Sequence, residues 1–323
     1  MPENIALGKS LPRVDAMEKI TGKATYASDV YLPGMLMCKL LTSTESHARI
    51  VRLDVSQAEA LPGVRAVITG KDYPDVRFGS GALKDRRIMA TDEVFYIGEP
   101  VAAVAADDEI TAREAVELIE VEYQPLPVVV DPLQAIRDDA VPVHEDLESF
   151  GGYGFAGGGN NCTLLDADRG DVVQAFKDAD HTFEETYQSQ PINQGFLEPM
   201  ACVAELEPNG RLTGWASTQG PYQVRAQLAL VLDIPVSRIK VIAMELGGGF
   251  GAKLRLALEA FPAMLAMKSG RPVKLINTRE EAFTLNGPRL ETNIRLKTGV
   301  MNDGRIVARE AYSIFDVGAY LGA

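Results

Sequence analysis

The stretch VIAMELGGGFGAK, from Val241 to Lys253, changes character halfway along its length. Its first half is apolar and partly β-branched, which predicts a strand, and its second half holds four glycines around Phe250. Glycine admits positive φ and lets another group approach the main chain, so consecutive N–H donors can converge on an anion or a metal-bound oxygen. The next segment, Leu254 to Lys268, has a helical pattern, and a helix N-terminus there would add partial positive charge.

Two other interpretations of this loop stay open. One is a tight turn between a strand and a helix that binds nothing. The other is a dinucleotide site, because Gly247, Gly249 and Ala252 fit the G-x-G-x-x-G/A pattern. Such a site needs an acidic residue about 20 residues on, at the end of the next strand, to hold a ribose. The run Pro272–Ile276 leads instead into Asn277–Arg279, so a nicotinamide site is the weakest of the three interpretations.

The heptapeptide GGGFGAK, Gly247 to Lys253, resembles the GGGFGGK loop of the molybdenum hydroxylases, the group of xanthine dehydrogenase, aldehyde oxidoreductase and 4-hydroxybenzoyl-CoA reductase. Other segments resemble that family's molybdopterin-binding large subunit in the same order along the chain. Around the loop these are Phe196–Ala204, Ser217–Arg225, Gly270–Val273, Thr278–Glu281 and Asp316–Tyr320. Near the N-terminus they are Thr21–Asp29, Ser46–Ile50, Leu61–Val64 and Gly98–Ala102, which resemble an α/β hammerhead domain.

The resemblance implies an α+β (mixed α/β) fold. A hammerhead-type domain is expected at residues 1–135, followed by the N-terminal part of a molybdopterin-binding domain at residues 136–323. A chain of 323 residues is long enough for about two domains. The acidic, proline-containing stretch Asp131–Glu148 predicts the linker, and the glycine-rich Gly151–Asn161 predicts a mobile surface loop. Helices are expected at Ile110–Leu118, Pro221–Leu232 and Arg255–Ser269, and a strand at Val64–Thr69.

Composition narrows the class of protein. A formal net charge of −13 disfavours binding to nucleic acid or to anionic membranes, because both require basic patches. No apolar run approaches the roughly 18 residues of a membrane span, and the N-terminus lacks the basic and apolar regions of an export signal. The sequence thus predicts a cytoplasmic protein. Cys38, Cys162 and Cys202 are widely spaced and are predicted to be reduced, mostly buried thiols.

Catalytic side chains are hard to find in this sequence. His47, His144 and His181 lack the H-x-x-x-H spacing of a helical metal site, so each is predicted to be structural or exposed. The sequence contains no G-x-S-x-G motif, so it gives no support to a serine hydrolase. Glu198 stands among apolar neighbours and is a candidate buried base. In the family that the chain resembles, however, the base is another glutamate, so a structural or supporting role is expected for Glu198.

The resemblance implies a molybdenum ion on a pyranopterin dithiolene, for which the cytosine dinucleotide is one candidate form. The expected cofactor-binding residues are Gly248, Gly249, Phe250, Gly251 and Ala252, with the main-chain N–H groups of Phe250 and Gly251 facing an oxygen ligand of the metal. Electrons would pass to [2Fe–2S] clusters and FAD in partner subunits. The glutamate base of the family lies near the end of the full subunit, so it is expected in a partner chain that supplies the second half of this subunit.

Two departures from the family pattern bear on substrate. Leu254 stands where purine-hydroxylating relatives carry a glutamate, and a leucine would leave polar groups of a purine unpaired, at about 1–3 kcal/mol each. In the register fixed by Glu198, Ile192 and Gln194 occupy the positions of a metal-facing glutamine and a histidine. A small shift in register would bring Gln190 or Gln194 to the metal instead.

These observations predict the molybdenum-cofactor-binding component of a multi-subunit oxidoreductase that acts on a non-purine aldehyde, aromatic or alicyclic substrate. One alternative keeps the cofactor but adds water to an activated double bond. Another is a non-catalytic scaffold that docks the iron–sulfur and flavin subunits.

Overall fold

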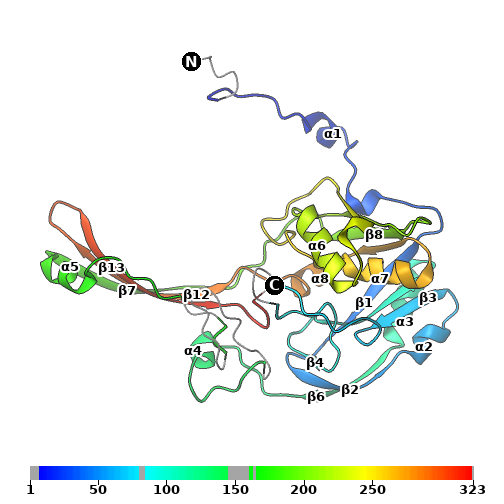
Figure 1. Cartoon of the computed structure of the whole chain (residues 1–323), viewed down its shortest axis with the longest axis horizontal. Coiled ribbons are helices and arrows are strands. Elements are labelled where there is room, and N and C mark those ends of the chain that lie inside the picture. The colour runs from blue at the N-terminus through cyan, green and yellow to red at the C-terminus, as the bar shows by residue number, and fades with distance from the viewer. Residues whose placement is uncertain (1–6, 80–83, 145–159, 163–164, 322–323) are drawn as a thin grey trace.

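A computed structural model describes residues 7–79, 84–144, 160–162 and 165–321. Figure 1 shows a body of sheets and helices, an N-terminal segment with helix α1 (Ala16–Ile20) that leads away from it, and a long arm of strands. Most of the glycine-rich segment Gly151–Asn161 lies outside the described residues, and so does the end of the expected linker.

The centre of the body is a seven-stranded sheet in the order β10-β9-β8-β11-β1-β5-β3. Its strands are β1 (Leu36–Thr42), β3 (Val64–Thr69), β5 (Pro100–Ala106), β8 (Ala201–Leu206), β9 (Leu212–Ala216), β10 (Ile239–Ala243) and β11 (Val273–Ile276). Strands β1 and β11 are parallel neighbours, although more than 200 residues separate them in sequence. The sheet therefore joins the two halves of the chain.

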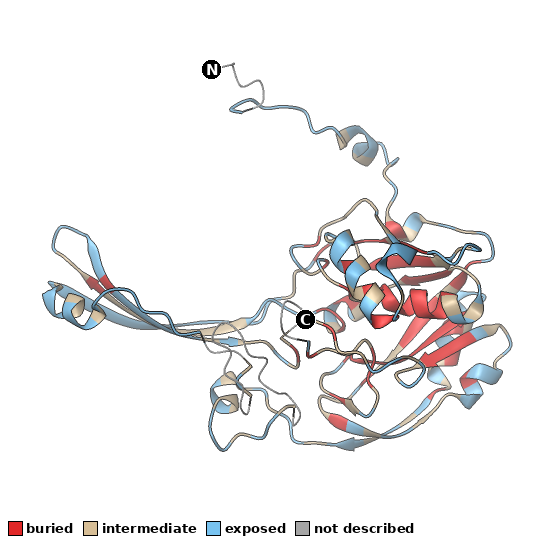
Figure 2. Ribbon diagram, in the orientation of Figure 1, coloured by how far each residue is buried: buried red, intermediate tan, exposed pale blue. Residues whose placement is uncertain are grey.

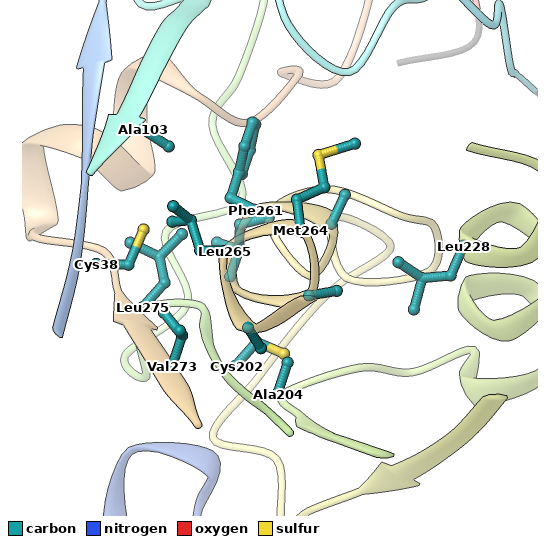
Figure 3. Packing of buried hydrophobic residues seen from close by; sticks show 14 of the residues in the cluster. Cys38, Ala103, Cys202, Ala204, Leu228, Phe261, Met264, Leu265, Val273 and Leu275 are labelled. Carbon is teal, nitrogen blue, oxygen red and sulfur yellow. The ribbon is translucent and has the colours of Figure 1, made fainter. Parts of the chain in front are cut away.

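Helices cover both faces of this sheet. The apolar helix α7 (Ala260–Ser269) packs on one face, where Figure 3 shows Leu265 of this helix beside Cys38 and Leu275. Helices α2 (Ser56–Ala60) and α3 (Glu109–Glu117) lie on the other face, against β3 and β5. Strand β5 is buried on both sides, which explains its unbroken apolar sequence.

Two smaller sheets complete the fold. Strands β4 (Glu93–Val94), β2 (Ala48–Asp54) and β6 (Glu120–Pro125) form one of them, beside the body. Strands β13 (Ile306–Asp316), β12 (Glu291–Val300) and β7 (His181–Ser189) form the arm. The remaining helices are α4 (Pro132–Ala135), α5 (Val172–Asp178), α6 (Pro221–Val231) and α8 (Arg279–Thr284), with 3₁₀ turns η1 (Ala27–Asp29) and η2 (Val236–Arg238).

The expected mixed α/β fold is confirmed, and helices α3 and α6 begin within one residue of the expected positions. The helix expected from Arg255 is shorter, since α7 begins at Ala260. Pro262 accounts for this difference, because proline is tolerated in the first turn of a helix but not further in. The glycine loop is therefore not followed directly by a helix N-terminus, and the expected contribution of helix charge is wrong. The division at residues 135 and 136 stays a prediction. In the described part of the chain, no helix is long and apolar enough to cross a membrane.

Candidate functional site

The segments singled out in the sequence meet at one edge of the seven-stranded sheet. Strands β9, β10 and β11 run in one direction and β8 in the other, so the carboxyl ends of the first three lie beside the amino end of β8. The glycine loop follows β10, Ser217–Gly220 follows β9, and Asn277–Arg279 follows β11. Phe196–Met200 leads into β8 at the same edge. Segments far apart in sequence thus form one site.

The glycine loop presents its main chain. Gly248, Phe250 and Gly251 have φ of +95°, +51° and +97°, and Phe250 is one of two non-glycine residues with positive φ in the described chain. Within the described residues, the N–H groups of Gly248, Gly249 and Phe250 donate to no hydrogen bond. Three consecutive free amides in a stretch where φ changes sign are the arrangement in which a main chain can bind an anionic or oxo group. The Phe250 side chain is 74% exposed beside them.

Glu198 and Lys253 hold the start and end of this loop. The N–H of Gly247 donates to Glu198 Oε2 (2.8 Å), and the N–H of Glu198 donates to Gly247 O (3.1 Å). Lys253 Nζ donates to Glu198 Oε2 (2.9 Å) and to Glu198 O (2.8 Å), and lies 4.5 Å from the centre of the Phe196 ring. The Lys253 side chain is completely buried, and burial lowers its pKa despite the opposing effect of Glu198. The supporting role expected for Glu198 agrees with these contacts.

The segment after β9 supports the other side of the loop. The N–H of Gln219 donates to Lys253 O (2.7 Å), and Gln219 Oε1 accepts from the N–H of Gly251 (3.1 Å). The amide of Gly251 is therefore engaged within the chain, in contrast to that of Phe250. A Cβ added at Gly249 would lie 2.4 Å from Gln219 Oε1, whereas one at Gly251 would meet nothing within 4 Å. The side of the loop at Gly251 is thus open.

Arg279 and Asn277 complete this edge. The Arg279 guanidinium donates to Phe196 O and Leu197 O, both at 2.7 Å, which fixes the main chain just before Glu198. Asn277 is 2% exposed, and neither its amide oxygen nor its amide nitrogen has a partner among the described residues. Glu198 Oε1 also lacks one. Arg279 lies in one of the segments that resemble the family, but the sequence alone indicates no role for it, nor for Gln219 or Asn277.

The glutamine candidates are not brought to the loop by a direct contact. Gln194 Nε2 donates to Gly287 O (3.1 Å), and its buried Oε1 has no partner among the described residues. Gln190 is exposed just after β7, and Ile192 pairs through its main chain with Arg289. Phe196 lies against the loop, because its Cβ would be 3.2 Å from a Cβ added at Gly248. Gln194 is nearer in sequence to Phe196 than Gln190 is. Gln190 and Gln194 both stay predictions.

Histidine and cysteine side chains do not form a metal site in the described part of the chain. His47 and His144 flank the Phe95 ring, with centroid distances of 5.3 and 4.3 Å, although they are distant in sequence. Cys38 and Cys202 are buried as predicted, and burial raises the pKa of both thiols.

A second contact joins the segment Asp316–Tyr320 to the region before β5. Tyr320 Oη donates to Glu99 Oε1 (2.6 Å), and the N–H of Phe95 donates to Glu99 Oε2 (2.6 Å). Burial raises the pKa of Glu99, while the hydrogen bond from Tyr320 opposes that rise. Two family-like motifs are thereby connected through one buried carboxyl group.

Replacing Tyr320 with phenylalanine is expected to lower the free energy of unfolding by about 2 kcal/mol, because a buried carboxylate loses its donor. The pKa of Glu99 should then rise further. A raised pKa in the folded state means that stability is lost as pH rises through that pKa, so the deficit of the variant should be larger at pH 8 than at pH 4. Denaturant unfolding at the two pH values checks this, and an equal deficit at both would contradict it.

Known proteins match two parts of the chain. Residues 156–323 match the molybdopterin cofactor-binding domain, and residues 21–127 match the a/b hammerhead domain of aldehyde oxidase and xanthine dehydrogenase. The chain is 38% identical to a probable xanthine dehydrogenase subunit of Bacillus subtilis, over 95% of this chain and 40% of that protein. It is 35% identical to the nicotinate dehydrogenase large molybdopterin subunit of Eubacterium barkeri, over 97% of this chain and 71% of that subunit.

Solved structures agree with these matches. Quinoline 2-oxidoreductase from Pseudomonas putida 86 superposes with a TM-score of 0.85 at 30% identity, over 97% of this chain and 40% of that one. Aldehyde oxidoreductase from Desulfovibrio gigas superposes with a TM-score of 0.84 at 26% identity, over 94% of this chain and 34% of that one. The chain therefore spans about 40% of the length of several relatives that it matches.

Proposed function

Because the chain belongs to the molybdenum hydroxylase family, as the N-terminal part of the molybdopterin-binding large subunit, we propose that its sheet edge holds the molybdenum–pyranopterin cofactor of an oxidoreductase complex. The observation that carries the proposal is the set of free amides at Gly248, Gly249 and Phe250. These donors are held in place by the buried Glu198–Lys253 pair, so they need not reorganise when a negatively charged oxygen binds.

The residues present fit such a group. A Cβ at Gly247 or Gly249 would lie within 2.5 Å of another atom. The main chain of the loop therefore lies too close to its neighbours to carry side chains at these two positions. The open side at Gly251 leaves room for a ligand, and the buried Gln194 Oε1 offers an acceptor that lacks a donor. Gly248–Ala252 would contact the cofactor through the main chain, with the N–H of Phe250 nearest the metal. The N–H of Gly251, which was also expected to face the metal, donates to Gln219 Oε1. When bound, the cofactor supplies the redox chemistry, and the chain orients it and excludes water.

The loop assignment is tested by comparing two glycines that both have positive φ. Gly251 and Gly270 both have positive φ, and a Cβ at either would meet nothing within 4 Å, but Gly270 lies at the opposite end of the sheet's strands. Gly251→Ala is expected to lower the molybdenum content of the natively purified assembly, and turnover per molybdenum by about 100-fold. Gly270→Ala also places a Cβ on a residue with positive φ, +68° against +97° at Gly251, and should change neither. Equal molybdenum content and turnover in both variants would remove the loop from the site.

We further propose a non-purine substrate of the aldehyde, aromatic or alicyclic type. Leu254 directly follows the loop, is 41% exposed, and presents only apolar atoms. Leu254→Glu is expected to raise kcat/KM for hypoxanthine by about tenfold or more, because a carboxylate can pair with the polar edge of the ring. Leu254→Met, an apolar control, should leave it unchanged. Steady-state kinetics of the native assembly test this, and efficient hypoxanthine oxidation by the unaltered protein would contradict the proposed class.

The proposed assembly contains further polypeptides. The catalytic glutamate base would come from the rest of the molybdopterin-binding subunit, and [2Fe–2S] and FAD subunits would carry electrons away. A cytoplasmic location and the cytosine dinucleotide form of the pterin stay predictions. Native purification, followed by mass spectrometry and by molybdenum, iron and flavin analysis, tests the assembly as a whole. Activity in an assembly that contains no pterin would contradict the proposal.

A further inference from the structure

Leu254 directly follows the glycine loop, and the main chain before it is fixed by the segment between β9 and α6. Lys253 O accepts the N–H of Gln219 at 2.7 Å and the hydroxyl of Thr218 at 3.1 Å. Thr218 is 4% exposed, and its Oγ1 also accepts the N–H of Gly220 at 3.1 Å. The carbonyl group that precedes Leu254 is therefore held by two donors from one short segment.

The main chain after Leu254 is fixed by a side chain of α6. Gln227 Oε1 accepts the N–H of Leu256 at 2.8 Å, and Gln227 Nε2 donates to Gly79 O at 3.3 Å. Leu256 is 1% exposed, and its N–H has no other acceptor among the described residues. Figure 2 shows α6 at the surface of the body, with buried strands of the central sheet beneath it. Gln227 therefore connects the span that carries Leu254 to the N-terminal half of the chain.

Gly220 approaches Leu254 where a side chain would not fit. A Cβ at Gly220 would lie 2.4 Å from Leu254 O and 3.2 Å from Gln223 Oε1, whereas ordinary contacts begin near 3.4 Å. The φ of Gly220 is −127°, outside the left-handed region that favours glycine. Glycine is thus required here by the closeness of Leu254 rather than by its own backbone conformation. A methyl group at this position would push the two residues apart by about 1 Å.

The contacts of Gln227 act on the span of Leu254 and not on the free amides of the glycine loop. The start of that loop is held by the Glu198 carboxylate, and its far side by the Gln219 side chain. Gln227 forms hydrogen bonds to Leu256 and Gly79 instead. A substitution of Gln227 can therefore move Leu254 while the free amides stay in place.

The position of Leu254 matters because substrate discrimination depends on small distances. A displacement of about 1 Å in a positioning group can lower turnover by about 100-fold. One methylene group in an apolar pocket discriminates between substrates by about 10- to 200-fold. Residues 251–258 belong to neither a helix nor a strand, so no regular secondary structure holds Leu254. Its placement depends on the contacts made by Gly220, Gln227 and the donors to Lys253 O.

We propose that Gly220 and Gln227 are positioning residues that determine substrate specificity, because they fix Leu254 relative to the glycine loop. Held in this place, Leu254 presents an immobile apolar surface, which favours an apolar carbonyl or ring compound over a purine. The inference rests on the proposed function, since it explains how the residue that excludes purines is kept in position. Gly220 and Gln227 act through Leu254 and do not touch the substrate themselves.

Hydrogen exchange tests the contact at Leu256 directly. Gln227→Met keeps a side chain of similar length but removes the acceptor. A buried N–H without an acceptor is unfavourable, so the span should move until the Leu256 amide reaches water. Exchange of that amide in the natively purified assembly, measured by mass spectrometry with residue-level fragmentation, should become at least tenfold faster. Gln227→Glu retains an acceptor and should retain slow exchange. Unchanged exchange in Gln227→Met would overturn the role of Gln227.

Hypoxanthine kinetics test the consequence for specificity. The gain in kcat/KM expected from Leu254→Glu requires its carboxylate to meet the polar edge of the ring accurately. Adding Gln227→Met should reduce that gain at least fivefold, because the carboxylate is then misplaced. Adding Gln227→Glu should leave the gain intact, and the molybdenum content should be the same in all these variants. A gain that survives Gln227→Met would show that specificity does not depend on this contact.

Gly220 is tested against Gly214 of β9, which also lacks a positive φ. A Cβ at Gly214 would lie 3.9 Å from its nearest neighbour, Val203 O, which is an ordinary contact. Combined with Leu254→Glu, Gly220→Ala should reduce the gain for hypoxanthine at least fivefold, whereas Gly214→Ala should not change it. Equal gains in the two combinations would remove Gly220 from the proposal.

Molybdenum analysis separates this inference from the proposed function. Molybdenum in the assembly, together with a gain that survives Gln227→Met, overturns the inference alone. Molybdenum with no gain from Leu254→Glu removes Leu254 from substrate recognition and the inference with it, while the cofactor assignment stands. Absence of molybdenum from the unaltered assembly overturns the cofactor assignment itself and everything that rests on it.

Discussion

Replacing Lys253 with methionine is expected to lower the free energy of unfolding by about 3–5 kcal/mol, the usual cost of removing one partner from a buried ion pair. The Lys253 side chain is completely buried and that of Glu198 is 10% exposed, so water cannot replace the lost partner. The Glu198 carboxylate would keep only the N–H of Gly247, since its Oε1 has no other partner among the described residues. Arg137→Met, which removes an exposed ion pair with Asp139, is the control and should have little effect.

A double-mutant cycle separates the ion pair from simple packing. Adding Glu198→Gln to Lys253→Met should restore about 1–3 kcal/mol, because the unpaired charge is then removed. The pH dependence gives a second check. The pKa of Lys253 is lowered in the folded protein, so the unfolded state binds more protons between the two pKa values and stability rises with pH in that window. The methionine variant should lack this rise. If the effects of the two substitutions on the free energy of unfolding simply add, or if Lys253→Met keeps the pH profile of the unaltered protein, Lys253 and Glu198 are not coupled.

The glycine loop could be predicted from sequence because its signal is local. Four glycines around Phe250 dictate a main-chain site, and the apolar run before them dictates the strand that positions it. The start of α7 is also encoded locally, because Pro262 can stand in the first turn of a helix but not further in, and the longer helix that apolar periodicity predicts is wrong. The alternation of apolar and polar residues along β7 is weak by itself. Only pairing with β12 and β13 shows that one face of the arm is apolar.

The partners of the loop could not be predicted, because they come from distant positions. Lys253 and Glu198 are 55 residues apart, and nothing in the sequence near either one identifies the other. Gln219 reaches Gly251 from another strand end, and β1 enters the sheet between β11 and β5 from the far end of the sequence. Such long-range pairings depend on tertiary packing rather than on local propensity. For the same reason, the dinucleotide interpretation fails in the structure: β10 and β11 are separated by β9 and β8 and cannot form an adjacent βαβ unit.

Gly247→Ala is expected to cost about 3 kcal/mol or more in unfolding free energy and to empty the cofactor site. A Cβ at Gly247 would lie 2.5 Å from Glu198 Cβ, an atom next to the main chain that cannot rotate away. Overpacking of this kind costs about 1–3 kcal/mol by itself, and the shift would also break the paired hydrogen bonds between Gly247 and Glu198.

The effect of this substitution should pass to the loop through Glu198. Once Glu198 moves, Lys253 loses its partner, and the loop that carries the free amides of Gly248, Gly249 and Phe250 loses the contacts that hold its two ends. Gly304→Ala is a suitable control, because Gly304 has positive φ, lies in the turn between β12 and β13, and has no atom within 4 Å of an added Cβ. Denaturant unfolding and molybdenum content of the native assembly are measured for both variants. The clash at Gly247 acts on the loop, whereas the strain at Gly304 does not. If Gly247→Ala retained as much molybdenum as Gly304→Ala, the contacts between Glu198 and the loop would not shape the cofactor site.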